Sequence, residues 1–158
     1  MAEALTYLPK TWVKKLSESG TKIVAVDETS SGRSQCVGKR VEILREKTDE
    51  FTIVHELMHA MDNVDEHFRT ESKAFFDERT KGAAIVSLQR MMKNDAYRYN
   101  EMARIVDDAY SPYVYKDYGG DAYEVSSMGI QYLYTDPISL KSKDPKLFSF
   151  ASRQLLGK

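Results

Sequence analysis

The hydrophobic pattern of the first 45 residues predicts one helix and two short strands. Apolar residues recur at helical spacing between residues 5 and 16, on the side that carries Leu8, Trp12 and Leu16. Residues 21–26 (TKIVAV) are rich in β-branched side chains and predict a strand. Residues 41–44 (VEIL) predict a second strand, and the turn-rich segment 27–39 between them predicts an exposed loop.

The rest of the chain predicts mostly helix. Thr48 offers an N-cap, and Asp49 and Glu50 favour the positive end of a helix that runs through residues 51–63 (FTIVHELMHAMDN). Tyr110 to Gly120 predicts an irregular, aromatic segment. Further helices are predicted near 70–79, 84–93, 101–109 and 121–134, and from Pro145, capped by Asp144, to Gly157. A little sheet before a central helix and mostly helix after it predicts an α+β fold in one domain, residues 1–158.

Charge and composition narrow the classes of function. The chain of 158 residues has 23 Lys and Arg against 24 Asp and Glu, so it lacks the basic field that nucleic-acid binding needs. No apolar run approaches a membrane span, and the N-terminal segment does not resemble a signal peptide. The single cysteine, Cys36, excludes an internal disulfide and a cysteine-based zinc site. We therefore expect a cytoplasmic or virion-associated protein.

The segment His55-Glu56-Leu57-Met58-His59 carries the candidate chemistry. Histidines four residues apart project from one face of a helix, so that both imidazoles can bind one ion. Glu56 lies about 100° around the helix, where it can reach a metal-bound water but is poorly placed as a ligand. This pattern predicts Zn²⁺ held by His55 and His59, with Glu56 as the general base.

Chance is the competing explanation of this motif. A pattern with three fixed positions arises in on the order of 1% of chains of this length, and the histidines would then be ordinary core or surface residues. Two of only three histidines in the chain fall on the pattern, and the segment around them predicts a half-apolar helix. These two facts favour metal binding.

A catalytic zinc needs a third protein ligand, and the sequence leaves several candidates. Glu124 is favoured, because it opens a helix 65 positions after His59, and the small residues Ser126, Ser127 and Gly129 that follow permit close helix packing. Asp121 and His67 are alternatives, although His67 also fits a solvated histidine near a helix start. Asp62 lies one turn after His59 and is either an acceptor for a ligand N–H or a solvated carboxylate.

HELMH with a later glutamate on a helix is similar to the gluzincin metallopeptidases, which implies a zincin-like fold and peptide hydrolysis. The spacing and the tyrosine-rich stretch before Glu124 resemble the lethal-factor and Pro-Pro endopeptidase group. In that group a tyrosine before the ligand glutamate stabilises the tetrahedral intermediate. Tyr118 is the nearest match here, with Tyr115 second, and both also fit core aromatics. Zincins commonly pair an extended peptide with a sheet edge, for which residues 41–44 are the candidate.

A second resemblance covers most of the chain. The succession TKIVAV, VEIL, TIVHELMHAMD, FFDERTKG, EVSSMGIQYLYTDP and KDPKLFSF resembles an HExxH domain at the end of some tailed-phage minor head (head-morphogenesis) proteins. The resemblance implies zinc, Glu124 as a ligand, a phage or prophage origin and phage head proteins as partners. It leaves two functions open: a zinc metallopeptidase that acts on a peptide or protein, and a non-catalytic, zinc-stabilised module of a phage head.

Overall fold

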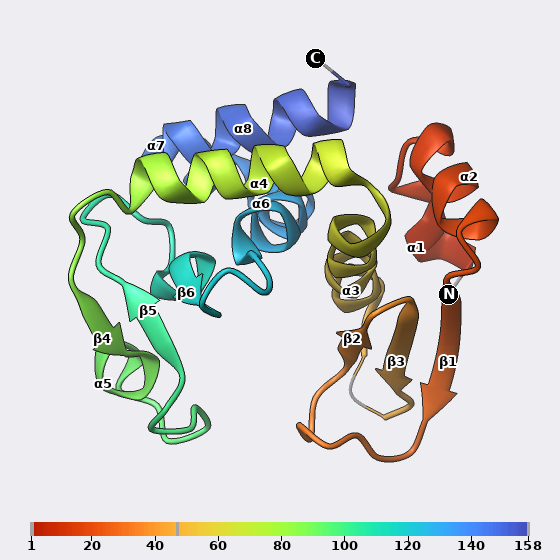
Figure 1. Cartoon of the computed structure of the whole chain (residues 1–158), viewed down its shortest axis with the longest axis horizontal. Helices are drawn as coiled ribbons and strands as arrows, with labels where there is room; N and C mark the ends of the chain where they lie inside the picture. The colour runs from red at the N-terminus through yellow and green to blue at the C-terminus, as the bar shows by residue number, and fades with distance from the viewer. Residues whose placement is uncertain (1, 47, 158) are drawn as a thin grey trace.

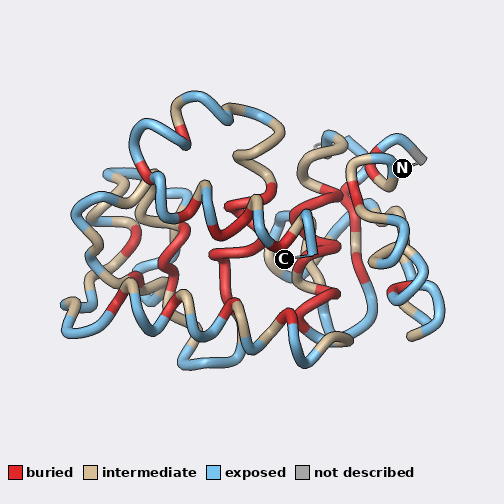
Figure 2. Tube along the Cα trace, turned by 90° about the horizontal axis from the view of Figure 1, so that it is seen from above, coloured by how far each residue is buried: buried red, intermediate tan, exposed pale blue. Residues whose placement is uncertain are grey.

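The computed structural model describes residues 2–46 and 48–157 and has a mixed α+β architecture with two small sheets. Both sheets lie on the same side of the molecule, and the helices α4, α7 and α8 cross the opposite side (Figure 1). Buried stretches run through the interior between these elements (Figure 2). None of the described helices is long and apolar enough to span a lipid bilayer.

Two helices, not one, precede the first sheet. They are α1 (Ala2–Thr6) and α2 (Lys10–Glu18), so the single helix predicted from 5 to 16 is wrong. The break falls at Pro9, which caps α2 and disfavours helical geometry in the residue before it. The two short helices still place apolar side chains in one core with the central helix, including Ala4 and Leu16, and Leu8 from the turn between them joins this core.

The first sheet has the order β1-β3-β2, with β1 (Lys22–Val26), β2 (Gln35–Val37) and β3 (Arg40–Leu44). β3 pairs in parallel with β1 and antiparallel with β2, so it is the central strand. The expectation that residues 41–44 form an open edge is therefore wrong. The edge strands are β1 and β2. β2 lies inside the segment predicted as a loop, and it was missed because a strand of three residues is too short to show periodicity.

The helix α3 (Glu50–Val64) carries the HELMH segment. Its N-cap is Asp49 and not the predicted Thr48, because the Asp49 carboxylate accepts a 2.7 Å hydrogen bond from the backbone N–H of Thr52. α4 (Glu66–Arg79) follows after Asp65, whose side chain caps it, so this helix begins four residues before the predicted position 70. α3 packs against α1, α2, the first sheet, α4 and α6.

The second sheet occupies a region that the sequence predicted to be largely helical. It contains β4 (Ile85–Ser87), β5 (Met102–Arg104) and β6 (Lys116–Asp117), all antiparallel, with the short helix α5 (Leu88–Met92) and the 3₁₀ turn η1 (Pro112–Tyr115). The prediction of a helix over residues 101–109 is wrong, because β5 lies there. Of the helix predicted over residues 84–93, the part that forms α5 is helical. Pairing of β5 with both neighbours overrides local propensity here.

Three helices complete the chain: α6 (Glu124–Thr135), α7 (Pro137–Lys143) and α8 (Pro145–Leu156). The predicted capping of α8 is confirmed, since Asp144 accepts a hydrogen bond from the N–H of Leu147 and Gly157 ends the helix at φ 63°. α7 was not predicted, although Asp136 and Pro137 give it the same start signal. Gly129 of α6 lies against α8.

This close approach generates a prediction. A Cβ at Gly129 would lie 3.1 Å from both Ala151 Cβ and Leu147 Cδ1, so there is no room for a larger side chain. Gly129→Leu should lower the free energy of unfolding by about 2 kcal/mol or more, through overpacking. Urea denaturation measures the change. Ser142→Leu, at an exposed position of α7, is the control and should have little effect; equal effects of the two would contradict close α6–α8 packing.

Candidate metal centre

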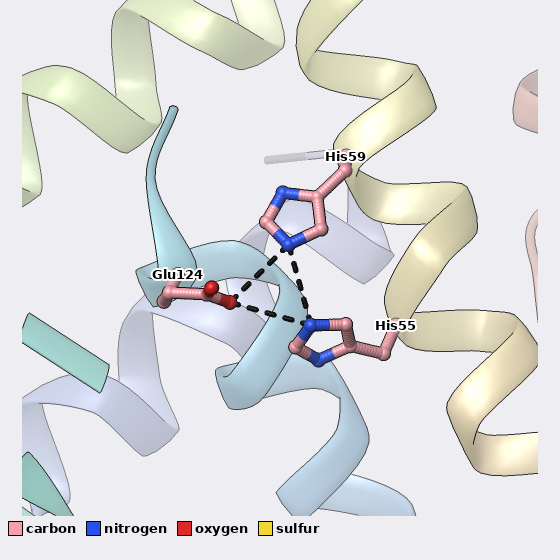
Figure 3. Close-up of side chains that lie close together, drawn as sticks. All are labelled: His55, His59 and Glu124. Atoms are coloured by element: carbon pink, nitrogen blue, oxygen red, sulfur yellow. Dashed lines mark hydrogen bonds and ion pairs between the residues drawn. The ribbon is translucent and has the colours of Figure 1, made fainter. Parts of the chain in front are cut away.

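Three side chains from two helices meet at one point. His55 and His59 project from α3 and Glu124 from the first turn of α6, and their metal-binding atoms all lie within 4.8 Å of one another (Figure 3). Glu124 Oε2 is 3.3 Å from His55 Nε2 and 3.2 Å from His59 Nε2. Glu124 is 1% exposed and His55 9%. Two imidazole nitrogens and one carboxylate oxygen are a donor set that could bind a metal ion.

Neighbouring side chains hold two of these residues in orientation. The amide oxygen Oε1 of Gln131 is 3.1 Å from His55 Nδ1, so that Nδ1 donates and Nε2 presents its lone pair to the cluster. Glu124 Oε1 accepts a 2.5 Å hydrogen bond from the Tyr118 hydroxyl. Glu124 Oε2 accepts a 2.8 Å hydrogen bond from Ser127. The ligand atoms are therefore fixed before any ion binds.

Asp62 lies buried beside His59 and is not the solvated carboxylate that the sequence also allowed. Its Oδ1 accepts a 3.2 Å hydrogen bond from Ser72, whose hydroxyl is 2.6 Å from that of Ser126. The other oxygen, Oδ2, is buried without a hydrogen-bond partner among the described residues. Burial raises the pKa of Asp62 to about 6, although the charge of His59 acts in the opposite direction.

Without an ion, the cluster is an ion pair between imidazole and carboxylate. Burial disfavours a charged His59, but the charge of Glu124 and its hydrogen bond to the ring outweigh this and raise the pKa of His59 to about 9. Burial also acts against the charge on Glu124, but the two histidines overcome it and hold its pKa well below the ordinary value. A bound cation would supply the positive charge that the proton on His59 supplies here.

The cluster opens onto a cleft of about 1090 Å³, which is lined on one side by β2 and on another by the segment from Tyr113 to Ala122. Glu56 lines the same cleft and is 7% exposed. Burial raises the pKa of Glu56, partly offset by the charges of His55 and His59. A carboxylate with a raised pKa, beside a cluster that could bind a metal ion, is able to act as a general base.

The alternative ligands lie apart from this cluster. The side chain of His67 is 83% exposed and lies 3.7 Å from Glu71 on its own helix, so its prediction as a solvated histidine is confirmed. Asp121 lines the cleft but does not belong to the group of converging atoms. Tyr115 is fully buried and donates to Asp144 while accepting from Arg79, so it is a core aromatic, and Tyr118 is the tyrosine at the cluster.

The sequence did not predict that Ser127 and Gln131 support the cluster, although their spacing from Glu124 indicates it. Ser127 and Gln131 stand three and seven positions after Glu124, and residues at this spacing share one face of a helix. The face of α6 that carries Glu124 was therefore available from the sequence. Which histidine Gln131 contacts could not be read from the sequence, because it depends on how α6 packs on α3.

Cys36 lies in β2 on the wall of the cleft. Burial raises the pKa of its thiol to about 12, so that it remains protonated at neutral pH.

A second group of charges lies at one end of the cleft, centred on Glu101. Its Oε1 accepts hydrogen bonds from Lys116 Nζ at 2.6 Å and Arg33 Nη2 at 3.0 Å, and its Oε2 accepts one from the backbone N–H of Arg98 at 2.8 Å. Burial acts to raise the pKa of Glu101, but the three donors, Lys116 foremost, lower it to about 2.

Comparisons of the chain with models of protein families, with curated protein sequences and with solved structures give no significant match. The assignment of a function therefore depends on the geometry and chemistry of the cleft.

Gln131→Ala should weaken metal binding roughly 10- to 100-fold, because His55 loses the acceptor that fixes its ring and tautomer. Zn²⁺ titration against a competing chelator measures the affinity. Gln131→Glu keeps an acceptor and should retain tight binding, and Gln89→Ala, away from the cluster, is the control. Wild-type affinity in Gln131→Ala would show that His55 needs no such support.

The low pKa of Glu101 makes its stabilising effect dependent on pH. A carboxylate whose pKa falls from an ordinary 4.5 to about 2 on folding contributes stability above pH 4.5 and loses it as the pH falls through about 2. As the pH is lowered from about 5 to about 2, the free energy of unfolding of Glu101→Gln should therefore fall less than that of the wild type. Thermal unfolding across this range measures the difference, with exposed Glu78→Gln as the matched control. Parallel curves for all three proteins would contradict the prediction.

Proposed function

We propose that the protein is a zinc-dependent metallopeptidase of the zincin type, with His55, His59 and Glu124 as ligands and Glu56 as the general base. One observation carries the proposal: the three ligand atoms lie within 4.8 Å of one another on the wall of a cleft that Glu56 also lines. Chance occurrence of HELMH would not by itself bring a carboxylate 65 residues away onto both histidines.

The donor set favours zinc over the other common ions. Calcium and magnesium take mainly oxygen ligands, whereas two imidazoles with one carboxylate are the protein ligands of many catalytic zinc sites. A bound Zn²⁺ would polarise the scissile carbonyl and lower the pKa of a water. The remaining steps belong to side chains of this chain.

Glu56 accepts the proton of the attacking water and delivers it to the amine nitrogen that leaves. Burial, which raises its pKa, makes the carboxylate a better base and lets it hold the proton between the two steps. Its place next to His55 in the sequence puts it on the cleft side of α3 without making it a ligand. Glu56 therefore performs acid–base work that neither histidine can perform while bound to metal.

Tyr118 has two roles in the proposal. Its hydroxyl donates to Glu124 Oε1, which orients the ligand carboxylate and leaves Oε2 for the ion. Burial and the charge of Glu124 raise the pKa of Tyr118 far above its ordinary value, so the hydroxyl keeps its proton. The hydroxyl has a single proton, so donation to the oxyanion of the tetrahedral intermediate, the role that the resemblance to the lethal-factor group implies, requires the hydroxyl to turn from Glu124 to the oxyanion when the intermediate forms.

The substrate strand would bind at β2. β2 is an edge of the first sheet, lies against α3 and lines the cleft, so it offers unpaired backbone groups next to Glu56. An extended peptide that paired with β2 would pass the metal position. Residues 41–44 cannot take this role, because β3 is paired on both sides.

A non-catalytic, zinc-stabilised module of a phage head protein is the second candidate. The near-complete burial of His55 and Glu124 favours it, because structural zinc sites are closed. The open cleft and the position of Glu56 favour catalysis instead. In either case phage head proteins remain the partners that the sequence resemblance implies.

The two functions differ in their response to three variants. The peptidase predicts about one zinc per wild-type chain, loss of zinc in Glu124→Ala, and, in Glu56→Gln, retained zinc with at least a 100-fold loss of peptide hydrolysis. Mass spectrometry of bound metal and of cleavage products from a peptide mixture gives both readouts.

Zinc in the wild type without any cleavage would support the structural module. Absence of zinc after reconstitution would overturn both candidates.

A further inference from the structure

Three basic side chains gather at the end of the cleft where the loop before β2 meets the loop before β5. Arg33 comes from the first loop, Arg98 from the second, and Lys116 from β6, and all three line the cleft. Besides its ion pair with Glu101, Lys116 lies 4.6 Å from the ring centre of Tyr118. The guanidinium of Arg98 contacts the carbonyl oxygen of Ser30, at 3.5 Å.

The charges at this end do not balance. Glu101 is the carboxylate that pairs with Arg33 and Lys116, and Asp117 nearby is paired with Arg104 at 2.7 Å. Arg33 and Lys116 share the one carboxylate of Glu101, and the guanidinium of Arg98 has no carboxylate partner among the described residues, so this group has two positive charges in excess. The excess is confined to this group of residues, because the lining of the cleft as a whole has three Lys or Arg residues against six Asp or Glu residues.

The guanidinium of Arg33 has N–H donors that are not used by its hydrogen bond to Glu101. It binds Glu101 through Nη2 alone, and no second hydrogen bond from its guanidinium is found within residues 2–46 and 48–157. Its side chain is 47% exposed, on the wall of the cleft. A guanidinium has five N–H donors in a fixed fork, which matches a carboxylate.

This basic end lies close to the candidate catalytic residues. Tyr118 connects this end to the cluster. Lys116 Nζ lies 4.6 Å from the centre of the Tyr118 ring, and the Tyr118 hydroxyl donates a 2.5 Å hydrogen bond to Glu124. Arg33 and Glu56 line the same cleft. Arg33 also stands two residues before β2, so a peptide strand paired with β2 would pass Arg33 at one end.

We propose that Arg33, with Arg98 and Lys116 on the same wall, binds a carboxylate of the substrate, so that this part of the cleft selects peptides that present a carboxylate to it. The inference rests on the proposed function, because it assumes that a peptide occupies the cleft. The carboxylate belongs either to an Asp or Glu side chain or to the C-terminus of the peptide. Both sources present the same chemistry to a guanidinium.

Glu101 is an internal competitor in this arrangement. Its Oε1 already accepts from two of the three cations, so it weakens their attraction for a second carboxylate. Replacing it with the neutral isostere glutamine removes that competition while keeping a hydrogen-bonding side chain of the same size. Arg33→Gln and Glu101→Gln should therefore change acidic-peptide binding in opposite directions.

The test measures binding separately from cleavage. Zinc-loaded Glu56→Gln protein is immobilised and exposed to three pools of random, N-acetylated decapeptides, and retained peptides are quantified by mass spectrometry. One pool contains Glu and ends in an amide, the second contains Gln and ends in a free carboxylate, and the third contains Gln and ends in an amide. Comparison with the third pool separates the two sources of carboxylate.

We expect at least one carboxylate pool to be retained about fivefold or more over the neutral pool, as for an exposed charged pair worth about 1 kcal/mol. The preference should disappear in Arg33→Gln, rise in Glu101→Gln, fall with added salt, and persist in Arg153→Gln, an exposed arginine of α8. Equal retention of all pools, or a preference that Arg33→Gln leaves unchanged, would overturn the inference.

A second measurement separates this inference from the peptidase proposal. The zinc-loaded protein with Glu56 intact is incubated with the same pools, and cleavage products are counted. A carboxylate preference in binding without any cleavage would contradict the peptidase and leave the acidic-peptide site standing. Cleavage without a carboxylate preference in binding would support the peptidase and contradict the proposed carboxylate site.

Discussion

The packing of α6 against α3 is the contact on which the candidate site depends. α3 supplies two histidines and α6 supplies one glutamate, so neither helix forms the cluster by itself. Small residues at the start of α6 let the helices approach, and Ser126 and Ser127 also satisfy buried polar groups there. On its other side α6 meets α8 at Gly129, where a single methyl group would be tight. The ligand geometry is thus fixed by packing on both sides of one helix.

The buried negative charge of Glu124 determines what can occupy the site between α3 and α6. A carboxylate that is 1% exposed is costly unless a cation accompanies it. The structure meets this need with the histidines, and Tyr118 and Ser127 donate hydrogen bonds to the same carboxylate. The arrangement favours occupation by a proton or by a metal ion over an empty site. The same constraint applies to Glu101 in the same cleft, where the accompanying cations are arginine and lysine in place of histidine.

Sequence reasoning succeeded where one local signal determined the outcome. The start of α8 follows from Asp144 and Pro145, and β1 follows from a run of β-branched residues. It failed where a strand was two or three residues long, as in β2 and β5, because periodicity needs more residues than these strands contain. Thr48 was predicted as the cap of α3, and only the three-dimensional structure shows that Asp49, through its hydrogen bond from the N–H of Thr52, takes this place.

The sequence by itself determined that His55 and His59 share one face of a helix, because a separation of four residues sets their relative direction. It also offered Glu124 as the acidic residue at the start of a later helix. Only the tertiary structure decided that Glu124 reaches both histidines, that Gln131 supports His55, and that Arg33 meets Glu101 from 68 positions away. These contacts join segments whose relative placement follows from the burial of apolar faces in two shared cores, which no local pattern of residues encodes.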